Sequence, residues 1–453
     1  MATEEIMTTR SEHPSPAPAT LPIPILEKRP SAVEMFVSLR VLNYRRFALG
    51  NMVANTAVWM QRIAMDWLVL QLSGSVAAVG VTVFMQFTPM LFLGLWGGVV
   101  ADRYSKLKIL LCTQSATAVL AGGLAALTLT GVVQVWHLYA ISFLLGLVTV
   151  IDNPARQVFV NELVGPRHLT NAISLNSSIY QLGGLIGPAV GGILITAVGG
   201  GWLFLINSLA CAGVVLNLLS LKREQLHQSP AVPPRKKQLK EGIHYVRSKP
   251  VIFWTIITVA VTAVFAFNMP VFLSAYANNV FRVGARGYGL FNALVAAGAL
   301  VGALASTRRT SIRLVVVVGC CAALGTIQAI AGLASGELMF GTLLIGVGVC
   351  NLLFITAANS LVQMSSNVQI RGRVISLYIL VLLGGQAVGG PIMGWIVDQI
   401  GPESAMVISG VVPLLTSLGI AIAIAKNRHL RVSWAPRGYL PWWTVAHQIQ
   451  RHH

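Results

Sequence analysis

The stretch GGVVADRYSKLK, residues 97–108, places four charged side chains between two apolar segments. The segment before it, VTVFMQFTPMLFLGLWGG at 81–98, carries no charge, and neither does ILLCTQSATAVLAGGLAALTLTG at 109–131. Each apolar segment is close to the ~20 residues that an α-helix needs to cross a bilayer. A short charged turn between two such segments is typical of a loop that joins two membrane-spanning helices.

The whole chain repeats this pattern. Of its 453 residues, 55% are hydrophobic and only 10% are charged, whereas a soluble domain carries about 25% charged residues. Backbone amides in lipid must bond within their own segment, so uncharged runs of this length form helices. We therefore predict an all-α membrane protein. Its twelve predicted spans are residues 47–72, 76–97, 109–130, 135–157, 169–198, 201–220, 250–277, 286–306, 312–333, 337–362, 372–398 and 402–425.

The basic residues indicate the orientation of these spans. Of the 32 Lys and Arg residues, 29 fall in the tails and loops of one side, and cytoplasmic loops carry such an excess. Both termini are predicted to be cytoplasmic: a largely disordered tail at 1–46 and a second tail at 426–453. We attribute the net charge of +18 to a basic rim that faces anionic lipid of the cell membrane. No nucleic-acid partner is expected.

A polar, basic segment at 221–249 divides the chain into two predicted bundles, 47–220 and 250–425. The bundles resemble each other, because glycines recur at matching offsets in spans five and eleven. Two similar halves around a central site are a plan of membrane transporters. The chain lacks a P-loop, an HExxH motif and a nucleophile elbow. We expect no enzymatic activity, metal or cofactor, and a monomer driven by an ion gradient.

The charged turn resembles the loop signature of the major facilitator superfamily, GxxxDRxGRR. Gly98, Asp102, Arg103, Lys106 and Lys108 carry the resemblance, although two positions depart from the pattern. It implies two pseudo-symmetric six-helix halves, close packing at Gly98, and a charged latch that closes the cytoplasmic face. The alternative interpretation is simple anchoring of the loop by its positive charges.

Span five is similar to the antiporter motif of the same superfamily, which favours export. The matching positions are Gly183, Gly187, Pro188, Gly191 and Gly192. The alternative is generic packing of small residues, which is common in membrane helices.

The stretches 55–75 and 152–178 resemble a bacterial exporter branch that includes enterobactin exporters and several antibiotic-efflux proteins. The arginine motif of many drug–proton antiporters is absent from span four. Asp152 and Arg156 stand at its end instead, and we predict a structural or gating turn there, broken by Pro154.

Arg62 and Asp66 lie inside span one, where ionisable side chains are costly and are commonly functional. Their four-residue spacing places them on one helix face, where they can pair. Asp66 is a candidate proton-coupling carboxylate, and a purely structural ion pair is the alternative.

The resemblance also implies a central cavity lined by spans one, four, seven and ten. Amide and aromatic side chains there suit a bulky amphiphilic substrate, such as a drug or siderophore-like molecule exchanged for protons. An importer of a small nutrient and a non-transporting sensor remain alternatives. The candidate cavity residues, including two from span five, are Asn55, Trp59, Tyr180, Gln181, Phe265, Asn268, Asn351, Phe354 and Asn359.

Overall fold

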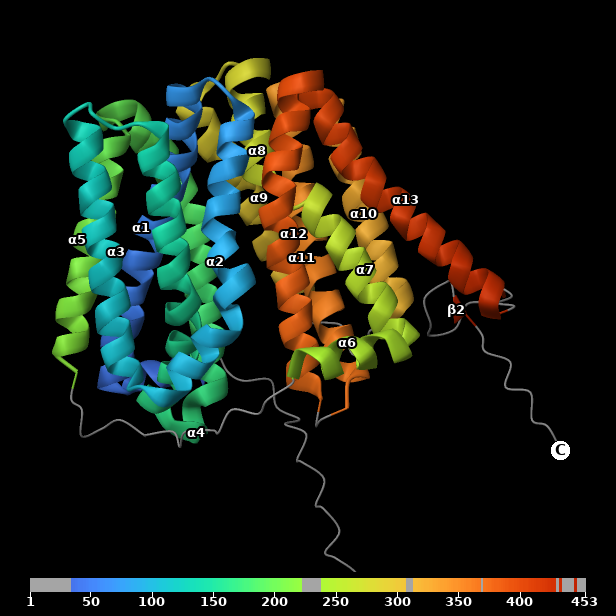
Figure 1. The fold of residues 1–453 in the computed structure, drawn as a ribbon, viewed down its shortest axis with the longest axis horizontal. Helices are drawn as coiled ribbons and strands as arrows, with labels where there is room; N and C mark the ends of the chain where they lie inside the picture. The colour runs from blue at the N-terminus through green and yellow to red at the C-terminus, as the bar shows by residue number, and fades with distance from the viewer. Residues whose placement is uncertain are drawn as a thin grey trace, which may run out of the picture.

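Long helices form most of the chain. The computed structural model describes residues 34–221, 238–306, 313–367, 370–428, 432–433 and 444–445, and Figure 1 shows two neighbouring helical bundles. Eleven segments of the described chain are long and apolar enough to cross a membrane, and they correspond to predicted spans two to twelve. The first predicted span is α1 (Leu42–Ser73), which runs alongside them but carries more polar side chains.

The N-terminal bundle begins earlier than predicted. A 3-10 helix, η1 (Glu34–Arg40), precedes α1, so part of the expected 1–46 tail is helical, and residues 1–33 lie outside the described chain. The Ser38 hydroxyl donates to Asn171 Oδ1 at 2.7 Å, which ties η1 to the bundle. The remaining helices of this bundle are α2 (Val76–Arg103), α3 (Lys106–Leu129), α4 (Val135–Val198) and α5 (Gly200–Leu219).

α4 contains predicted spans four and five, joined through a kink at Gly165. The backbone there has φ 66°, a conformation that glycine adopts at little steric cost. The predicted break at Pro154 is therefore wrong, since the helix continues past it to the kink. Pro154 has no N–H to offer the Val150 carbonyl, and Gly97 of α2 packs against that carbonyl.

The C-terminal bundle contains a helix in the segment predicted as a loop. α6 (Gln238–Ser248) precedes a seventh span that is broken at Ala266–Asn268 into α7 (Pro250–Phe265), α8 (Met269–Ala275) and the π-helical turn η3 (Tyr276–Val280). The other helices are α9 (Gly284–Ser306), α10 (Leu314–Gly332), α11 (Glu337–Ser365), α12 (Arg371–Ile400) and α13 (Pro402–Arg428). In the predicted C-terminal tail, β1 (Val432–Ser433) pairs antiparallel with β2 (Thr444–Val445).

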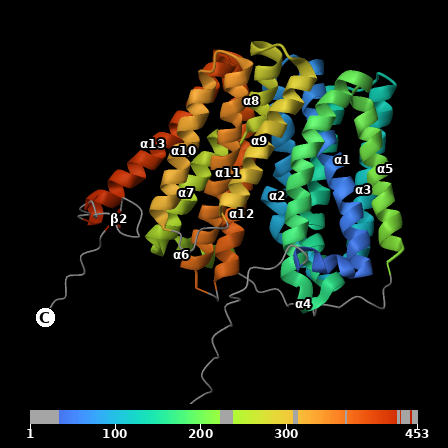
Figure 2. The same cartoon turned by 180° about the vertical axis from the view of Figure 1, so that it is seen from behind.

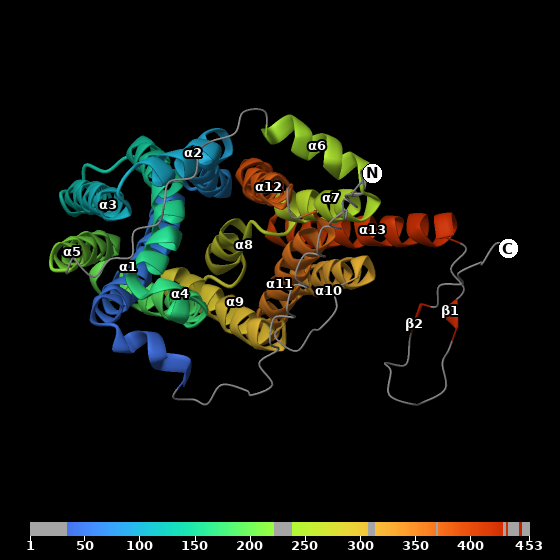
Figure 3. The same ribbon diagram turned by 90° about the horizontal axis from the view of Figure 1, so that it is seen from below.

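The two bundles meet at one end of the molecule and diverge toward the other, as Figures 1 and 2 show. We call the end with η1, the α2–α3 turn and α6 the basic face, and the end with the α1–α2 and α12–α13 turns the closed face. Between the bundles, α2 packs on α12 and the second part of α4 packs on α9 (Figure 3). One cluster of buried side chains from both bundles includes Trp67 and Tyr288 near the closed face.

Candidate transport site

A buried carboxylate joins the two bundles just inside the closed face. Asp66 of α1 is 4% exposed, and the hydroxyl of Tyr288 on α9 donates to its Oδ2 at 3.0 Å. The ring of Tyr288 stacks on Trp67, with centroids 6.0 Å apart. Asp66 therefore takes part in a contact between the two bundles. Its place in the sequence did not predict Tyr288 as its partner.

A second carboxylate closes the same face from the C-terminal bundle. Asp398, near the end of α12, accepts the Ser75 hydroxyl at 2.6 Å and the backbone N–H groups of Val76 and Ala77 at 3.0 Å. These are the first residues of α2, and an anion at a helix N-terminus is favoured by the unpaired N–H groups there. Sequence analysis missed Asp398, because an acid at the end of a span resembles an ordinary loop residue.

Glycines allow the bundles to approach each other along this contact. A Cβ on Gly80 of α2 would overlap the carbonyl of Gly390 on α12, and a Cβ on Gly192 of α4 would lie 2.8 Å from the Cα of Gly289 on α9. We call the contacts of Asp66, Asp398 and these glycines the external seal, a name that follows the orientation proposed below. The backbones of the two bundles therefore approach each other directly at these glycines.

The glycines of the expected antiporter motif pack α4 against α1. A Cβ on Gly187 would lie 2.8 Å from the Thr56 carbonyl oxygen, and one on Gly191 would lie 3.3 Å from the Cα of Met60. Gly183 faces Asn55, whose amide donates to the carbonyls of Ile179 and Tyr180 at 3.1 and 3.2 Å. Pro188 lies beside them and presents its carbonyl to Gly289 of α9. One helix therefore contacts both α1 and the opposite bundle.

Arg62 does not form the expected ion pair with Asp66. The ion pairs found within the described chain lie elsewhere, at Lys106–Glu162 and Arg156–Asp152. The guanidinium of Arg62 lies over the ring of Trp59 instead, 5.0 Å from its centroid. The face of an indole attracts a cation, which explains why the side chain turns toward Trp59.

Asp152 and Arg156 form the centre of a polar network inside the N-terminal bundle. Arg156 Nε donates to Asp152 Oδ2 at 2.9 Å, and the Thr113 hydroxyl and Gln114 amide donate to Oδ1 at 2.6 and 3.1 Å. Arg156 also donates to Asn51 at 2.6 Å. The pair lies within a continuous helix and joins it to α1 and α3, which is a structural arrangement rather than a turn.

The charged turn at the basic face is partly rearranged relative to the prediction. Lys106 lies 3.7 Å from Glu162 of α4, while Arg103 and Lys108 are exposed. Gly98 has no neighbour within 4 Å of an added Cβ, so the expected close packing there is wrong, and Gly97 makes the contact instead. The side chain of Asp102 lies outside the described part of the structure.

The expected cavity residues separate into two groups. Phe354 is fully buried against Phe267, and Asn268 is 1% exposed with its amide donating to the Val264 carbonyl at 2.9 Å. These two, with Asn55, stabilise helix packing in this conformation. The partly or largely exposed candidates are Trp59, Tyr180, Gln181, Phe265, Asn351 and Asn359.

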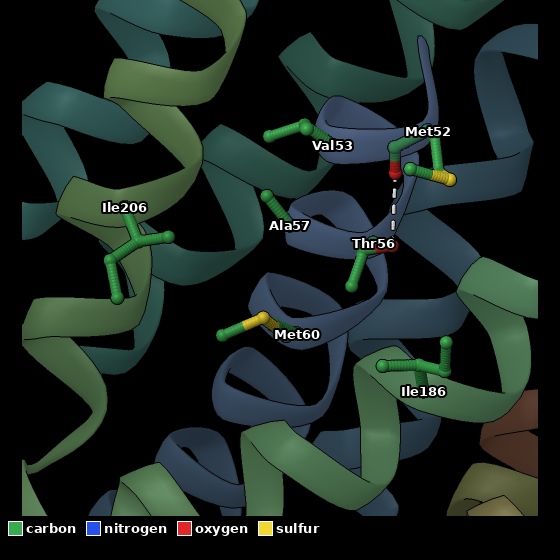
Figure 4. A pocket seen from close by; sticks show the side chains of 7 residues that line it. All are labelled: Met52, Val53, Thr56, Ala57, Met60, Ile186 and Ile206. Carbon is green, nitrogen blue, oxygen red and sulfur yellow. Dashed lines mark hydrogen bonds between the residues drawn. The ribbon is translucent and has the colours of Figure 1, made fainter. Parts of the chain in front are cut away.

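A separate apolar cavity of about 310 Å³ lies between α1, α4 and α5 (Figure 4). Thr56 supplies the one polar side chain in its lining, and its hydroxyl donates to the Met52 carbonyl at 2.9 Å. The cavity therefore offers no free polar group to a ligand. Its lining residues are Met52, Val53, Thr56, Ala57, Met60, Ile186 and Ile206.

Comparison with known proteins identifies the family. The sequence profile of the transmembrane secretion effectors matches residues 34–448. The chain belongs to this transporter family. The nucleoside transporter NupG has the same fold, with a TM-score of 0.68 and 12% identity over 84% of this chain and 99% of that one. So does a bacterial homologue of the lysosomal transporter Spinster in an inward-facing conformation, with a TM-score of 0.62 and 14% identity over 87% of this chain and 96% of that one.

The chain is also similar to two named bacterial transporters. It is 27% identical to the staphyloferrin A transporter of Staphylococcus aureus over 252 residues, which are 54% of this chain and 62% of that protein. It is 25% identical to the enterobactin exporter EntS of Escherichia coli over 406 residues, which are 86% of this chain and 93% of that protein. The major facilitator fold, the multi-pass membrane character and the absence of an enzymatic role are thereby established.

Proposed function

We propose that this transporter exports a bulky amphiphilic molecule, of the drug or siderophore-like kind, in exchange for protons. The basic face is cytoplasmic in this proposal, with both termini on that side of the cell membrane, because cytoplasmic loops carry the excess of Lys and Arg. The external seal then closes the outer end, and the bundles diverge toward the cytoplasm. Substrate enters from the cytoplasm and leaves when the seal opens.

The contact between Asp66 and Tyr288 is the observation that carries this proposal. A carboxylic acid costs less to bury than a carboxylate, so a protonated Asp66 stabilises the closed seal. When the seal opens, Asp66 meets the outer solution and takes up a proton there. After the seal closes, the proton leaves to the cytoplasm. A bound substrate must then favour the opening of the seal while Asp66 is in its carboxylate form.

Relatives and residue chemistry support the substrate class. The names of two relatives refer to staphyloferrin A and enterobactin, and the exposed candidates around Trp59 and Tyr180 combine aromatic surface with polar groups. The antiporter-like glycines of α4 support export over nutrient import. Uptake of a labelled nutrient into cells, with no efflux from loaded vesicles, would favour the importer instead.

The test uses proteoliposomes with an imposed pH gradient and a substrate chosen by comparing the susceptibility of deletion and overexpression strains. We expect wild-type protein to accumulate substrate against its gradient. Asp66→Asn should still allow downhill movement, because the amide keeps the size and a bond to Tyr288, but should lose pH-driven accumulation. The matched control is Glu403→Gln, a carboxylate at the start of α13. Uphill transport at the wild-type rate in Asp66→Asn would remove Asp66 from the coupling mechanism.

A further inference from the structure

Arg62 is an intramembrane cation whose donors have no acceptor in the described chain. A guanidinium carries five N–H donors in a planar fork, yet none of them makes a hydrogen bond or an ion pair with a described residue. Its guanidinium lies over the ring of Trp59 instead. Arginine inside a span normally pairs with an acid or with carbonyl groups, so this side chain is available to a ligand.

A second donor without a partner lies beside it. The indole Nε1 of Trp59 is buried and has no hydrogen-bond acceptor among the described residues. Buried N–H groups without a partner are rare, and an indole nitrogen can only donate. The two neighbouring groups can only donate hydrogen bonds, and one of them is positively charged. An acceptor with negative charge would therefore bind to them.

The surroundings of these donors fit a flat ligand. Tyr180 meets the Trp59 ring edge-on, with centroids 5.8 Å apart, and is 55% exposed, so the tyrosine side is open. Gly184 lies at the Nε1 edge of the indole, where an added Cβ would be 3.5 Å from Cε2 and 3.7 Å from Nε1. Arg62 stands four residues before Asp66, or about 6 Å nearer the basic face. The group therefore lies just inside the external seal.

We infer that Arg62 and Trp59 form a recognition subsite for the anionic group of an aromatic or otherwise planar substrate, such as a carboxylate attached to a ring. This inference rests on the proposed export function and specifies its substrate class. The guanidinium fork binds a carboxylate through two parallel hydrogen bonds, the indole N–H adds a third, and Tyr180 packs against the attached ring.

The subsite also connects substrate binding to the seal. Asp66 is the carboxylate one turn away from Arg62, and its Oδ2 accepts the Tyr288 hydroxyl. A bound anion neutralises the Arg62 charge and leaves the Asp66 carboxylate buried without a neighbouring cation. An uncompensated buried charge destabilises the structure that holds it, so anion binding favours the opening of the seal.

Binding to the full-length protein in nanodiscs tests this inference with 2-naphthoate and its neutral counterpart 2-naphthamide. Calorimetry should show wild-type protein binding the acid roughly tenfold or more tightly than the amide, since hydrogen bonds to a charged group contribute more than neutral ones. Arg62→Gln should abolish this preference. Arg62→Lys should give an intermediate preference, because it keeps the charge but loses the fork. Trp59→Phe should weaken binding of the acid while retaining the preference.

The matched control is Arg45→Gln, which changes an exposed arginine of the same helix and should leave both affinities unchanged. Equal affinity for the two probes, no binding of either probe, or a preference that survives Arg62→Gln would overturn the subsite. If Arg62→Gln does not fold, the Arg62→Lys and Trp59→Phe pair decides the question. If the protein prefers the acid but exports no substrate, the proposed function is wrong and the subsite stands. If Arg62→Gln exports substrate like the wild type, the subsite is wrong and the proposed function stands.

Discussion

Two arginines of the N-terminal bundle show what a charge requires inside a membrane. Arg156 donates to two acceptors, Asp152 and Asn51, and Thr113 and Gln114 also donate to Asp152. Arg62 has no acceptor in the described chain and lies on an aromatic ring. A satisfied charge stabilises one structure, whereas an unsatisfied charge binds whatever supplies the missing partner. We therefore assign packing to the first arginine and recognition to the second.

Removing Arg156 should destabilise the N-terminal bundle. Arg156→Ala leaves the Asp152 carboxylate buried with only Thr113 and Gln114 as donors, and breaking a buried ion pair in this way costs about 3 kcal/mol or more. Thermal unfolding of the purified protein should show a clearly lower midpoint. The Arg45→Ala variant, at an exposed position of α1, should unfold like the wild type. If both variants had the same midpoint as wild type, the network would contribute nothing to stability.

At the scale of the element, the packing of the second part of α4 on α1 depends on glycines, which have no side chain. Gly191→Leu should force α4 away from α1, because even a Cβ there lies 3.3 Å from the Cα of Met60. We expect the variant to insert in the membrane but to transport poorly or leak, as measured in proteoliposomes. Gly213→Leu on α5 is the control, since its Cβ would meet nothing within 4 Å. Normal transport by Gly191→Leu would exclude the packing role.

The helices α2 and α12 form the other contact between the bundles, and Asp398 caps α2 across it. Asp398→Ala removes three hydrogen bonds to the first turn of α2, so the closed face should open more often. Spin labels at the exposed positions Leu72 and Ile400 can report this by electron–electron double resonance. We expect a larger population at long distance. Glu403→Gln should not shift the distribution, and an unchanged distribution in Asp398→Ala would show that the cap does not hold the seal.

At the scale of the whole molecule, α2 and α12 each carry an acid near their last turn, and these two acids stand at opposite ends of the molecule. Asp398 stands near the end of α12 and caps the start of α2 at the closed face. Asp102 stands near the end of α2, at the basic face where α12 begins. Alternating access requires that one face opens as the other closes. Asp398 would hold the closed face shut in one state, and Asp102 would hold the basic face shut in the other.

Asp102→Asn tests the cytoplasmic half of this exchange. The substitution keeps the size of the side chain but removes the charge that we expect to latch the basic face when the external seal opens. Transport should fall about tenfold, which corresponds to ~1.4 kcal/mol in the relevant equilibrium, with normal protein levels in the membrane. Vesicle efflux normalised to protein measures it, and Lys249→Gln, which changes an exposed cation after α6 at the same face, is the control. Efflux at the wild-type level with equal amounts of protein would show that the turn only anchors the loop by its positive charges.

The sequence by itself determined the membrane character, the span boundaries to within eight residues and the glycine face of the second part of α4. These properties are local, because span length, apolarity and glycine spacing act within one helix. It did not show that the helix continues through Pro154, because a proline in a long membrane helix can be accommodated by a neighbour such as Gly97 of α2.

Only the tertiary structure decided the partners of the charged side chains. Four-residue spacing allowed Arg62 to pair with Asp66, yet Trp59 competes for the arginine and Tyr288, 222 residues away in the chain, donates to the acid. Asp398 reaches the start of α2 across more than 320 residues. Such contacts depend on how the two bundles meet, and no periodicity within a helix encodes that meeting. Sequence analysis therefore supplied Asp66, Arg62 and Trp59 as candidates but missed Asp398 and Tyr288, and the connections among these residues came from the packing of one bundle on the other.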